Sequence, residues 1–326
     1  MSQNPPRSNA MARVLIFGGT GFIGSHLARH CLEQGDRVVI AARRQSNSWR
    51  LADVLDSVVI HPVSLLDQTA IARLFDEVRP DHVYYLVAQA KRPPERSFSD
   101  VVDSIGEDLM SLVNVMSAAA TAAPKSFVRA GSLAEYGNGP APFLESQREK
   151  PLNAYGASMA AGTHFAQMMQ PRLSYPAIHA RLALCYGPGQ SSEFLIPALI
   201  QNCMAGQPTV IRRPNDRRDL IYVMDVVTGL RKLANAPLPG GTVVNLATGI
   251  APAMIEVARE VVRVLGGRQK QIVIDEAPAQ PDTTSYLCGS AALARQLIDW
   301  RPETGFAEGL QRTLNAIKKD TSTVVT

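Results

Sequence analysis

The fold of the chain is decided by the stretch RVLIFGGTGFIG, residues 13–24. Its apolar beginning, 14–17, predicts a buried strand, and 22–34 has the apolar spacing of a helix. Gly35 follows that helix, as glycine often does at helix ends, and a β-branched run at 38–41 predicts a second strand. The order strand, helix, strand predicts a βαβ unit with parallel strands.

The glycines after the first strand have the spacing of a phosphate-binding turn. Gly18 allows a tight turn, Gly21 lets a pyrophosphate approach backbone N–H groups, and Gly24 allows the helix to pack closely on the strand. We therefore expect a dinucleotide cofactor here, and a turn without a ligand is the less favoured alternative. The expected contacts are Gly18, Thr20, Gly21, Phe22, Ile23 and Gly24.

The end of the second predicted strand indicates which dinucleotide binds. A carboxylate at this place holds the ribose 2′-hydroxyl of NAD, but residues 41–47 read AARRQSN and contain no acid. Because guanidinium groups match phosphate oxygens, Arg43, Arg44 and Ser46 favour the 2′-phosphate of NADP. NAD remains the alternative, since a basic pair often does no more than solvate a loop.

The rest of the chain extends the same pattern and then loosens. Apolar runs predict strands at 58–61, 82–87, 126–130 and 177–184, and helical spacing predicts helices at 68–78, 100–123 and 155–169. Beyond residue 185, Pro and Gly interrupt the alternation. Helices are expected there at 225–233 and 253–265, with a short strand at 243–246 that could return to the main sheet.

These elements predict an α/β fold class: a Rossmann-type doubly wound parallel sheet with a smaller C-terminal α/β substrate domain. The expected division is a disordered tail at 1–11, the NAD(P)-binding domain at 12–184, the substrate domain mainly at 185–316, and a tail at 317–326.

Composition excludes several classes of protein. With 326 residues, 46% hydrophobic and 19% charged, the chain is of ordinary globular composition. The net charge of +4 is spread along the chain, so nucleic-acid binding is not expected, and neither is a membrane span. The four cysteines form no C-x-x-C pair and the histidines show no ligand spacing, so we expect no metal site and a cytoplasmic location.

Motifs along the chain together resemble the extended short-chain dehydrogenase/reductases, in their nucleotide-sugar epimerase/dehydratase branch. They are GGTGFIG at 18–24, LVAQ at 86–89, GSLAEYG at 131–137, YGAS at 155–158, YGPG at 186–189 and RDLIYV at 218–223. Over 41–51 the chain is most similar to the GDP-mannose dehydratase and GDP-4-keto-6-deoxymannose reductase subgroup. The resemblance covers residues 13 to about 316 and implies hydride transfer at a sugar carbon. It also implies a homodimer formed through helices 100–123 and 155–169.

The resemblance assigns the catalytic positions. It implies that the Tyr155 hydroxyl is the acid/base and that the Ser132 hydroxyl binds the same sugar oxygen, with Ala88 and Tyr155 beside the cofactor. The family places a lysine one helical turn after the tyrosine, but this chain has Met159. A thioether carries no charge, so the cation that favours the phenolate is missing at that position.

The resemblance also implies the substrate side of the site. The expected contacts with a nucleotide-diphosphate sugar are Gln89, Lys91, Tyr186, Arg218 and Asn245. Glu135 is expected to face the sugar as a further catalytic residue, with a solvated loop acid as the alternative. Leu133 and Ala134 stand where dehydratases carry an acid, so a 4,6-dehydratase is not expected.

The predicted function is a 4-ketoreductase or epimerase that uses NADP(H) on a nucleotide-diphosphate sugar, with GDP among the candidate nucleotides. Because of Met159, two alternatives stay open. One is a non-redox nucleotide-sugar isomerase or mutase on the same fold, and the other is a nucleotide-binding pseudoenzyme.

Overall fold

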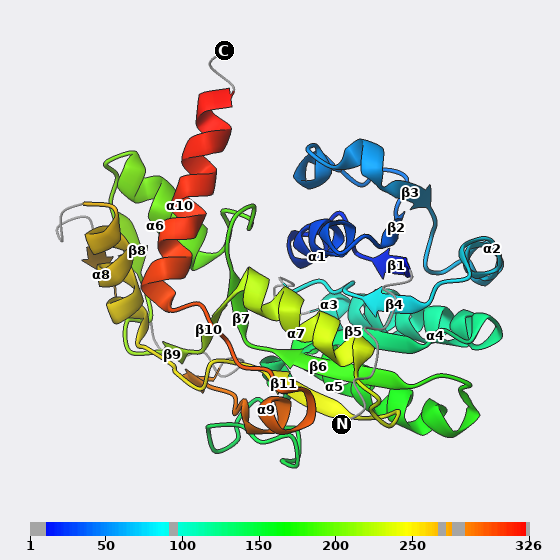
Figure 1. The fold of residues 1–326 in the computed structure, drawn as a ribbon. Helices are drawn as coiled ribbons and strands as arrows, with labels where there is room; N and C mark the ends of the chain where they lie inside the picture. The colour runs from blue at the N-terminus through cyan, green and yellow to red at the C-terminus, as the bar shows by residue number, and fades with distance from the viewer. Residues whose placement is uncertain (1–10, 91–96, 267–271, 276–283, 324–326) are drawn as a thin grey trace, which may run out of the picture.

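The computed structural model describes residues 11–90, 97–266, 272–275 and 284–323. At its centre is a seven-stranded sheet in the order β11-β6-β5-β4-β1-β2-β3, with every neighbouring pair parallel (Figure 1). The strands are β1 (Arg13–Phe17), β2 (Arg37–Ala42), β3 (Val59–Pro62), β4 (His82–Tyr85), β5 (Ser126–Ser132), β6 (Ala177–Leu182) and β11 (Val243–Leu246). The predicted doubly wound α/β sheet is therefore confirmed.

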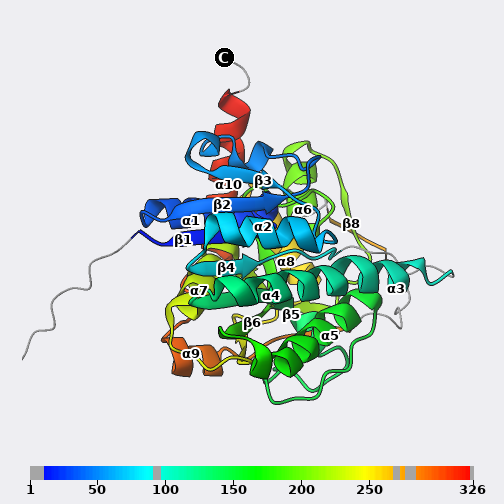
Figure 2. The same ribbon diagram turned by 90° about the vertical axis from the view of Figure 1, so that its right-hand side faces the viewer.

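Helices cover both faces of this sheet. One face packs against α1 (Phe22–Glu33), α7 (Val223–Asn235) and α9 (Ala292–Ile298). On the other face lie α2 (Gln68–Val78), α4 (Met110–Ala122) and α5 (Ala154–Met169), which Figure 2 shows in front of the strands. Each face has its own apolar core, so the strands are buried on both sides, as their continuous apolar runs require.

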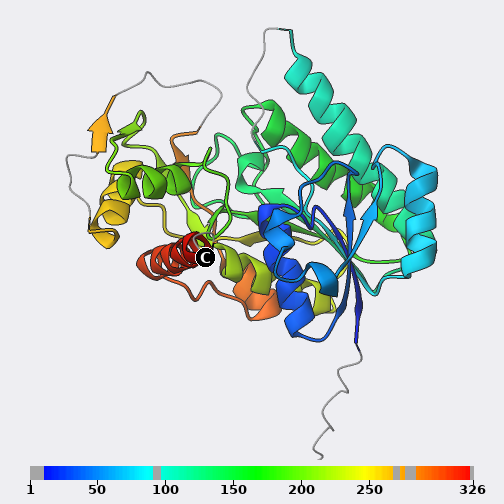
Figure 3. The same cartoon turned by 90° about the horizontal axis from the view of Figure 1, so that it is seen from above.

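A smaller lobe lies beside the carboxyl ends of the strands (Figure 3). Its helices are α6 (Leu195–Met204), α8 (Met254–Val264) and α10 (Phe306–Thr323), packed around a third apolar core. Three two-stranded pairs complete it: β7 (Leu184–Tyr186) with β10 (Leu220–Tyr222), β8 (Thr209–Ile211) with β12 (Ile272–Ile274), and β9 (Arg217–Arg218) with β13 (Tyr286–Leu287). None of the helices in the described ranges has the length and apolar character to cross a bilayer.

Most predicted elements lie within a few residues of the observed ones, and the strand at 243–246 does return to the main sheet as the partner of β6. The predicted helix at 100–123 is interrupted, because α3 (Ser99–Asp103) passes through a π-helical stretch, η3 (Ser104–Leu109), before α4. The predicted strand at 177–184 divides after Leu182, where the chain leaves the sheet and β7 pairs with β10.

The structure corrects the expected C-terminal tail. Helix α10 continues to Thr323, through residues that the sequence analysis assigned to a tail starting at 317. Phe306, Leu310, Leu314 and Ile317 recur at helical spacing and pack against the core of the smaller lobe, which anchors α10 as far as Ile317, and the helix continues past that packed part. Residues 1–10 of the expected N-terminal tail lie outside the described residues, and the helices α6, α9 and α10 were not predicted.

Candidate functional site

The glycine turn between β1 and α1 is built so that side chains cannot enter it. Gly18 has a φ of +82°, and the Gly21 N–H donates to its carbonyl oxygen at 3.0 Å. A Cβ at Gly24 would lie 2.2 Å from the Gly18 oxygen, and a Cβ at Gly18 would lie 2.9 Å from the Leu86 oxygen. Backbone surrounds both positions, so the roles expected for Gly18 and Gly24 have a direct steric basis.

A cavity of about 540 Å³ extends from this turn along the ends of the strands to the smaller lobe. It brings together expected site residues from distant parts of the chain. These are Gly18, Gly21, Phe22, Ile23, Gly24, Ala88, Ser132, Tyr155, Tyr186 and Arg218. The volume is in the range of small-molecule sites, and the open glycine turn at one end fits the diphosphate of a dinucleotide.

Tyr155 and Ser132 reach the cavity from adjoining elements. Helix α5 begins just before Tyr155, where the Asn153 side chain accepts the Gly156 N–H at 2.9 Å. Ser132 ends β5, and its hydroxyl oxygen accepts the Ala134 N–H at 3.1 Å. A Cβ at Gly156 would lie 2.7 Å from the Ala134 oxygen, so this glycine lets α5 approach the turn that carries Ser132.

Burial raises the pKa of the Tyr155 phenol above its ordinary value of 10.0. A hydrogen bond with Ser132 and the charge of Arg129 act in the opposite direction, whereas Glu135 and Asp108 raise the pKa further. The raised value keeps the phenol protonated near neutral pH. Tyr155 is therefore prepared to donate a proton at the cavity wall.

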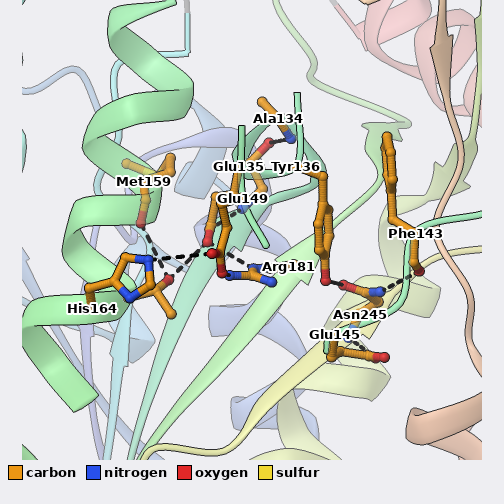
Figure 4. Close-up of polar contacts among 12 residues, drawn as sticks. Ala134, Glu135, Tyr136, Phe143, Glu145, Glu149, Met159, His164, Arg181 and Asn245 are labelled. Atoms are coloured by element: carbon orange, nitrogen blue, oxygen red, sulfur yellow. Dashed lines mark hydrogen bonds and ion pairs between the residues drawn. The ribbon is translucent and has the colours of Figure 1, made fainter. Parts of the chain in front are cut away.

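Glu135 does not face the cavity, which corrects its expected role beside the sugar. The side chain is fully buried, and its carboxylate accepts the Ser132 N–H at 3.1 Å, the Thr163 hydroxyl at 2.9 Å and Arg181 Nε at 2.8 Å. Figure 4 shows Glu135, Arg181 and Glu149 grouped together. The spacing Ser-x-x-Glu at 132–135 is that of a capping box, a signal the sequence analysis overlooked.

Asn245 also lies away from the cavity, contrary to the expected substrate contact. Its side chain is fully buried, accepting the Tyr136 hydroxyl at 2.8 Å and donating to the Phe143 oxygen at 3.0 Å (Figure 4). Its backbone N–H donates to Glu145 at 2.8 Å. These contacts tie β11 to the segment after Tyr136, because a buried amide needs partners for both its oxygen and its nitrogen.

Met159 is buried beneath the cavity wall and is not among the cavity's lining residues. Its carbonyl oxygen accepts Arg129 Nη2 at 2.9 Å, and its Sδ lies 3.6 Å from the same nitrogen. The position expected for a lysine therefore contacts a guanidinium from another element.

On the substrate side, Tyr186 and Arg218 both line the cavity. The Tyr186 hydroxyl donates to the Phe306 oxygen at 3.2 Å, and Arg218 pairs with Asp216 at 2.7 Å. Asp219, the other neighbour of Arg218, is buried and accepts hydrogen bonds from Thr248, Gly249 and Gly289.

The remaining expected contacts lie outside the cavity wall. Arg43 and Arg44 are exposed beyond β2, Ser46 is half-buried, and none of the three lines the cavity; the same holds for Thr20 and Gln89. Lys91 lies outside the described residues. Arg50 was not predicted as a contact but does line the cavity, donating from Nε to the Gly189 oxygen at 2.8 Å and stacking on Trp49.

Known proteins resemble this chain along most of its length. A UDP-glucose 4-epimerase of Mycolicibacterium smegmatis is 27% identical over 315 residues, which are 93% of this chain and 97% of the relative. A dTDP-glucose 4,6-dehydratase of Escherichia coli is 25% identical over 340 residues, covering 93% and 91%.

Two solved structures show the same architecture. The Thermus thermophilus UDP-glucose 4-epimerase, in complex with NAD, has a TM-score of 0.83 and 27% identity, covering 94% of this chain and 99% of that one. An epimerase of Methanothermobacter thermautotrophicus has a TM-score of 0.86 and 25% identity, covering 98% and 95%. The model of the NAD dependent epimerase/dehydratase family matches residues 14–247. With its glycine turn, Ser132 and Tyr155 on one cavity, the chain belongs to the NAD dependent epimerase/dehydratase family.

Proposed function

We propose that this protein is a 4-ketoreductase or epimerase that uses NADP(H) on a nucleotide-diphosphate sugar. The observation that carries the proposal is the single cavity lined by the glycine turn, Ser132 and Tyr155. A site that places a proton donor beside a dinucleotide cradle suits hydride transfer coupled to proton transfer.

The residues have separate roles in this reaction. The nicotinamide, when bound, supplies or accepts a hydride at the sugar carbon. In reduction, the phenol of Tyr155, which is protonated at neutral pH, donates a proton to the sugar oxygen, and the Ser132 hydroxyl orients that oxygen. Epimerisation starts in the opposite direction, so Tyr155 first accepts the proton of the sugar hydroxyl as the phenolate and returns it when the ketone is reduced again. Ala134 lines the cavity where a dehydratase's acid is implied by the resemblance, which supports reduction or epimerisation over dehydration.

The choice of NADP rests on charge at the end of β2. Arg43 and Arg44 are exposed there and free of an acidic neighbour in sequence, so both can turn toward a 2′-phosphate. The Thermus thermophilus relative was solved with NAD, so NAD is the competing cofactor.

The nucleotide of the sugar donor is a separate question. Relatives of this chain are named for UDP- and dTDP-sugars, whereas the likeness to GDP-sugar enzymes lies at 41–51. Because that stretch follows β2 and contains the proposed cofactor contacts Arg43 and Arg44, its likeness does not by itself favour GDP. We keep GDP as one candidate beside UDP and dTDP.

A non-redox isomerase or mutase is the second candidate function. The observation that favours it is Met159, which provides no charge next to Tyr155. An enzyme that needs no phenolate would tolerate this residue. A pseudoenzyme would bind the nucleotides without turnover.

We also propose that the protein is a homodimer in the cytoplasm. The helices expected at the dimer face carry exposed apolar side chains, among them Val102, Ile105, Met110, Phe165 and Met168. Such a patch on neighbouring helices is typical of a covered surface. The cysteines are free, which suits a reducing compartment. Sedimentation that finds only monomer at micromolar concentration would contradict the dimer.

The test is incubation of the protein with GDP-, UDP-, CDP- and dTDP-sugars, including their 4-keto-6-deoxy forms, with and without NADP or NAD in the reduced form for a reductase and in the oxidised form for an epimerase. A reductase consumes reduced cofactor in proportion to product, and an epimerase forms product without net consumption. Deuterium at the sugar carbon whose configuration changes separates an epimerase from a non-redox isomerase, because hydride transfer breaks that carbon–deuterium bond, slows turnover and keeps the label in the product. If nucleotides bind but no product forms, the pseudoenzyme is the remaining interpretation.

A further inference from the structure

A buried arginine from the sheet lies against the helix that carries Tyr155. Arg129 of β5 is 1% exposed, and its Nη1 donates to the Thr163 hydroxyl at 3.0 Å. Its Nη2 donates to the Met159 oxygen at 2.9 Å and lies 3.6 Å from the Met159 sulfur. The guanidinium therefore occupies the turn of α5 that follows Tyr155.

Helix α5 makes room for this group at Gly162. A Cβ there would lie 2.6 Å from Arg129 Nη2 and 2.9 Å from its Cζ. Any larger residue at 162 would push the guanidinium away from the Met159 oxygen. Three features of α5, the uncharged Met159, the small Gly162 and the hydroxyl of Thr163, are thus matched to one arginine.

The charged groups around Tyr155 act on its phenolate form in opposite directions. Glu135 from the turn after β5 and Asp108 from η3 are anions that disfavour the phenolate, and Arg129 is the cation that favours it. Glu135 is itself paired with Arg181 at 2.8 Å. A guanidinium stays protonated at all working pH values, so its charge is permanent.

We propose that Arg129 is a positioning residue that supplies, from β5, the positive charge that Tyr155 uses for proton transfer. This inference rests on the proposed function and names how the same site works without a lysine at 159. An ammonium at 159 would stand beside the guanidinium, and like charges at that distance repel. The presence of Arg129 therefore favours an uncharged residue such as Met159 at this position. The guanidinium is held in place by two hydrogen bonds, so its charge is already oriented before the reaction begins.

The experiment measures the titration of Tyr155 directly, in protein without a sugar nucleotide. The chain is labelled with 3-fluorotyrosine, whose phenol is more acidic than that of tyrosine, and the ¹⁹F resonance of position 155 is assigned with Tyr155→Phe. In Arg129→Gln, we expect the apparent pKa of position 155 to rise by on the order of one pH unit. Arg129→Lys keeps the charge and should show a smaller rise.

A second substitution tests whether a lysine ammonium at position 159 can replace the guanidinium of Arg129. Met159→Lys in the Arg129→Gln background should bring the pKa of position 155 back toward the parent value. In the parent background, Met159→Lys should lower the melting temperature and lower that pKa much less, because its ammonium faces Arg129. Equal effects in the two backgrounds would overturn the proposal.

Gly162→Ala keeps the test decisive if Arg129→Gln does not fold. It leaves Arg129 in the chain but displaces the guanidinium, so the pKa of position 155 should rise in the same direction by a smaller amount. Gly106→Ala is the matched control, since Gly106 is an exposed helical glycine with no atom within 4 Å of an added Cβ. A titration of position 155 unchanged in folded Arg129→Gln or Gly162→Ala would refute the role of Arg129.

Failure of this inference is distinguishable from failure of the proposed function. If no sugar nucleotide is converted but the titration moves as expected, the charge role stands and the proposed reaction falls. If a sugar is converted, the basic limb of the kcat profile in Arg129→Gln should move with the ¹⁹F titration while KM for the sugar changes little. A change in KM alone would assign Arg129 a merely structural role.

Discussion

The glycine turn after β1 and the first turns of α5 form two parts of one cavity, but they are built in different ways. In the turn, Gly18 and Gly24 are each required by nearby backbone: the Leu86 oxygen, just after β4, faces Gly18, and the Gly18 oxygen faces Gly24. In α5, the chemistry of Tyr155 depends on Glu135 and Arg129, which come from β5 and the turn that follows it.

The difference teaches which kind of site tolerates change in its motif. Only glycine has no Cβ, so no other residue fits where backbone comes this close. The glycines of the turn therefore stay where the pattern requires them. An electrostatic site needs a charge in the right place, and a neighbouring element can provide it. Met159 can therefore replace a lysine when Arg129 lies against the same turn.

The largest effect is expected in α5. Tyr155→Phe removes the proton donor, and turnover should fall by about 10²- to 10⁴-fold, as for other general acids. Affinity for the dinucleotide should change little, because the glycine turn is untouched. Titration calorimetry and steady-state kinetics with the converted sugar measure the two quantities.

Tyr85→Phe is the control for that change. Tyr85 is also buried, and within the described ranges its hydroxyl has no hydrogen-bond partner. Wild-type turnover in Tyr155→Phe, beside wild-type Tyr85→Phe, would exclude acid–base work by Tyr155 and favour the non-redox alternative.

Next in size is the effect of a methyl group in the turn. Gly24→Ala would place a Cβ 2.2 Å from a backbone oxygen that no side-chain rotation can move. The free energy of unfolding should fall by about 3 kcal/mol. The affinity for the dinucleotide should fall as well. Urea denaturation followed by circular dichroism measures it, and Gly106→Ala should change stability by less than about 1 kcal/mol. A Gly24→Ala protein as stable as Gly106→Ala would show that the turn can relax.

A smaller effect is expected after β2, where Arg43 is proposed to bind the 2′-phosphate of NADP. Arg43→Ala should weaken NADP(H) binding by about 2 kcal/mol, because it removes a charge-assisted contact with the 2′-phosphate. NAD(H) binding should stay the same. Arg37→Ala, at the opposite end of the same strand, is the control. Equal affinities of Arg43→Ala and the parent protein for NADP(H) would contradict the assignment of the cofactor.

The smallest effect is a pH dependence that differs between the two regions. Burial lowers the pKa of His179, beside Arg129 and Arg181, well below 6.5, and burial also lowers that of His26 in α1. The His179 ring stays neutral in the folded chain, and the His26 ring takes up a proton at a lower pH than a free histidine, whereas both rings take up a proton in the unfolded chain as the pH falls through about 6.5. The contribution of the two neutral rings to the free energy of unfolding is therefore fully present above pH 6.5 and is lost as the pH falls below it. The loss is at most about 1.4 kcal/mol per pH unit for each ring.

Denaturation at pH 7.5, 6.5 and 5.5 compares the two histidines. His179→Leu should flatten the loss of stability below pH 6.5 more than His26→Leu does, because the pKa of His179 is lowered further. The reverse order would mean that α1, and not the charged region under α5, contains the more strongly perturbed histidine.

The local pattern of the sequence was sufficient for the parallel sheet, for most of the flanking helices and for the glycine turn. These features depend on periodicity and on backbone conformation, which neighbouring residues determine. Ser132 and Tyr155 were assigned by the resemblance to a known family and not by the local pattern, and the structure places both on one cavity. The packed part of α10 could also have been predicted from the spacing of Leu310, Leu314 and Ile317.

Only the tertiary structure decided which polar residues face the cavity and which are buried beneath it. Glu135 and Asn245 were expected at the substrate and instead satisfy hydrogen bonds in the interior, with side-chain partners 28 to 109 positions away. Arg129 attracted no notice in the sequence, since a single arginine in a strand has no motif. Its position against Met159, 30 residues further along the chain, exists only because β5 and α5 pack together. Charge acts through space, so the electrostatics of this site were decided by the packing of elements and not by the order of residues.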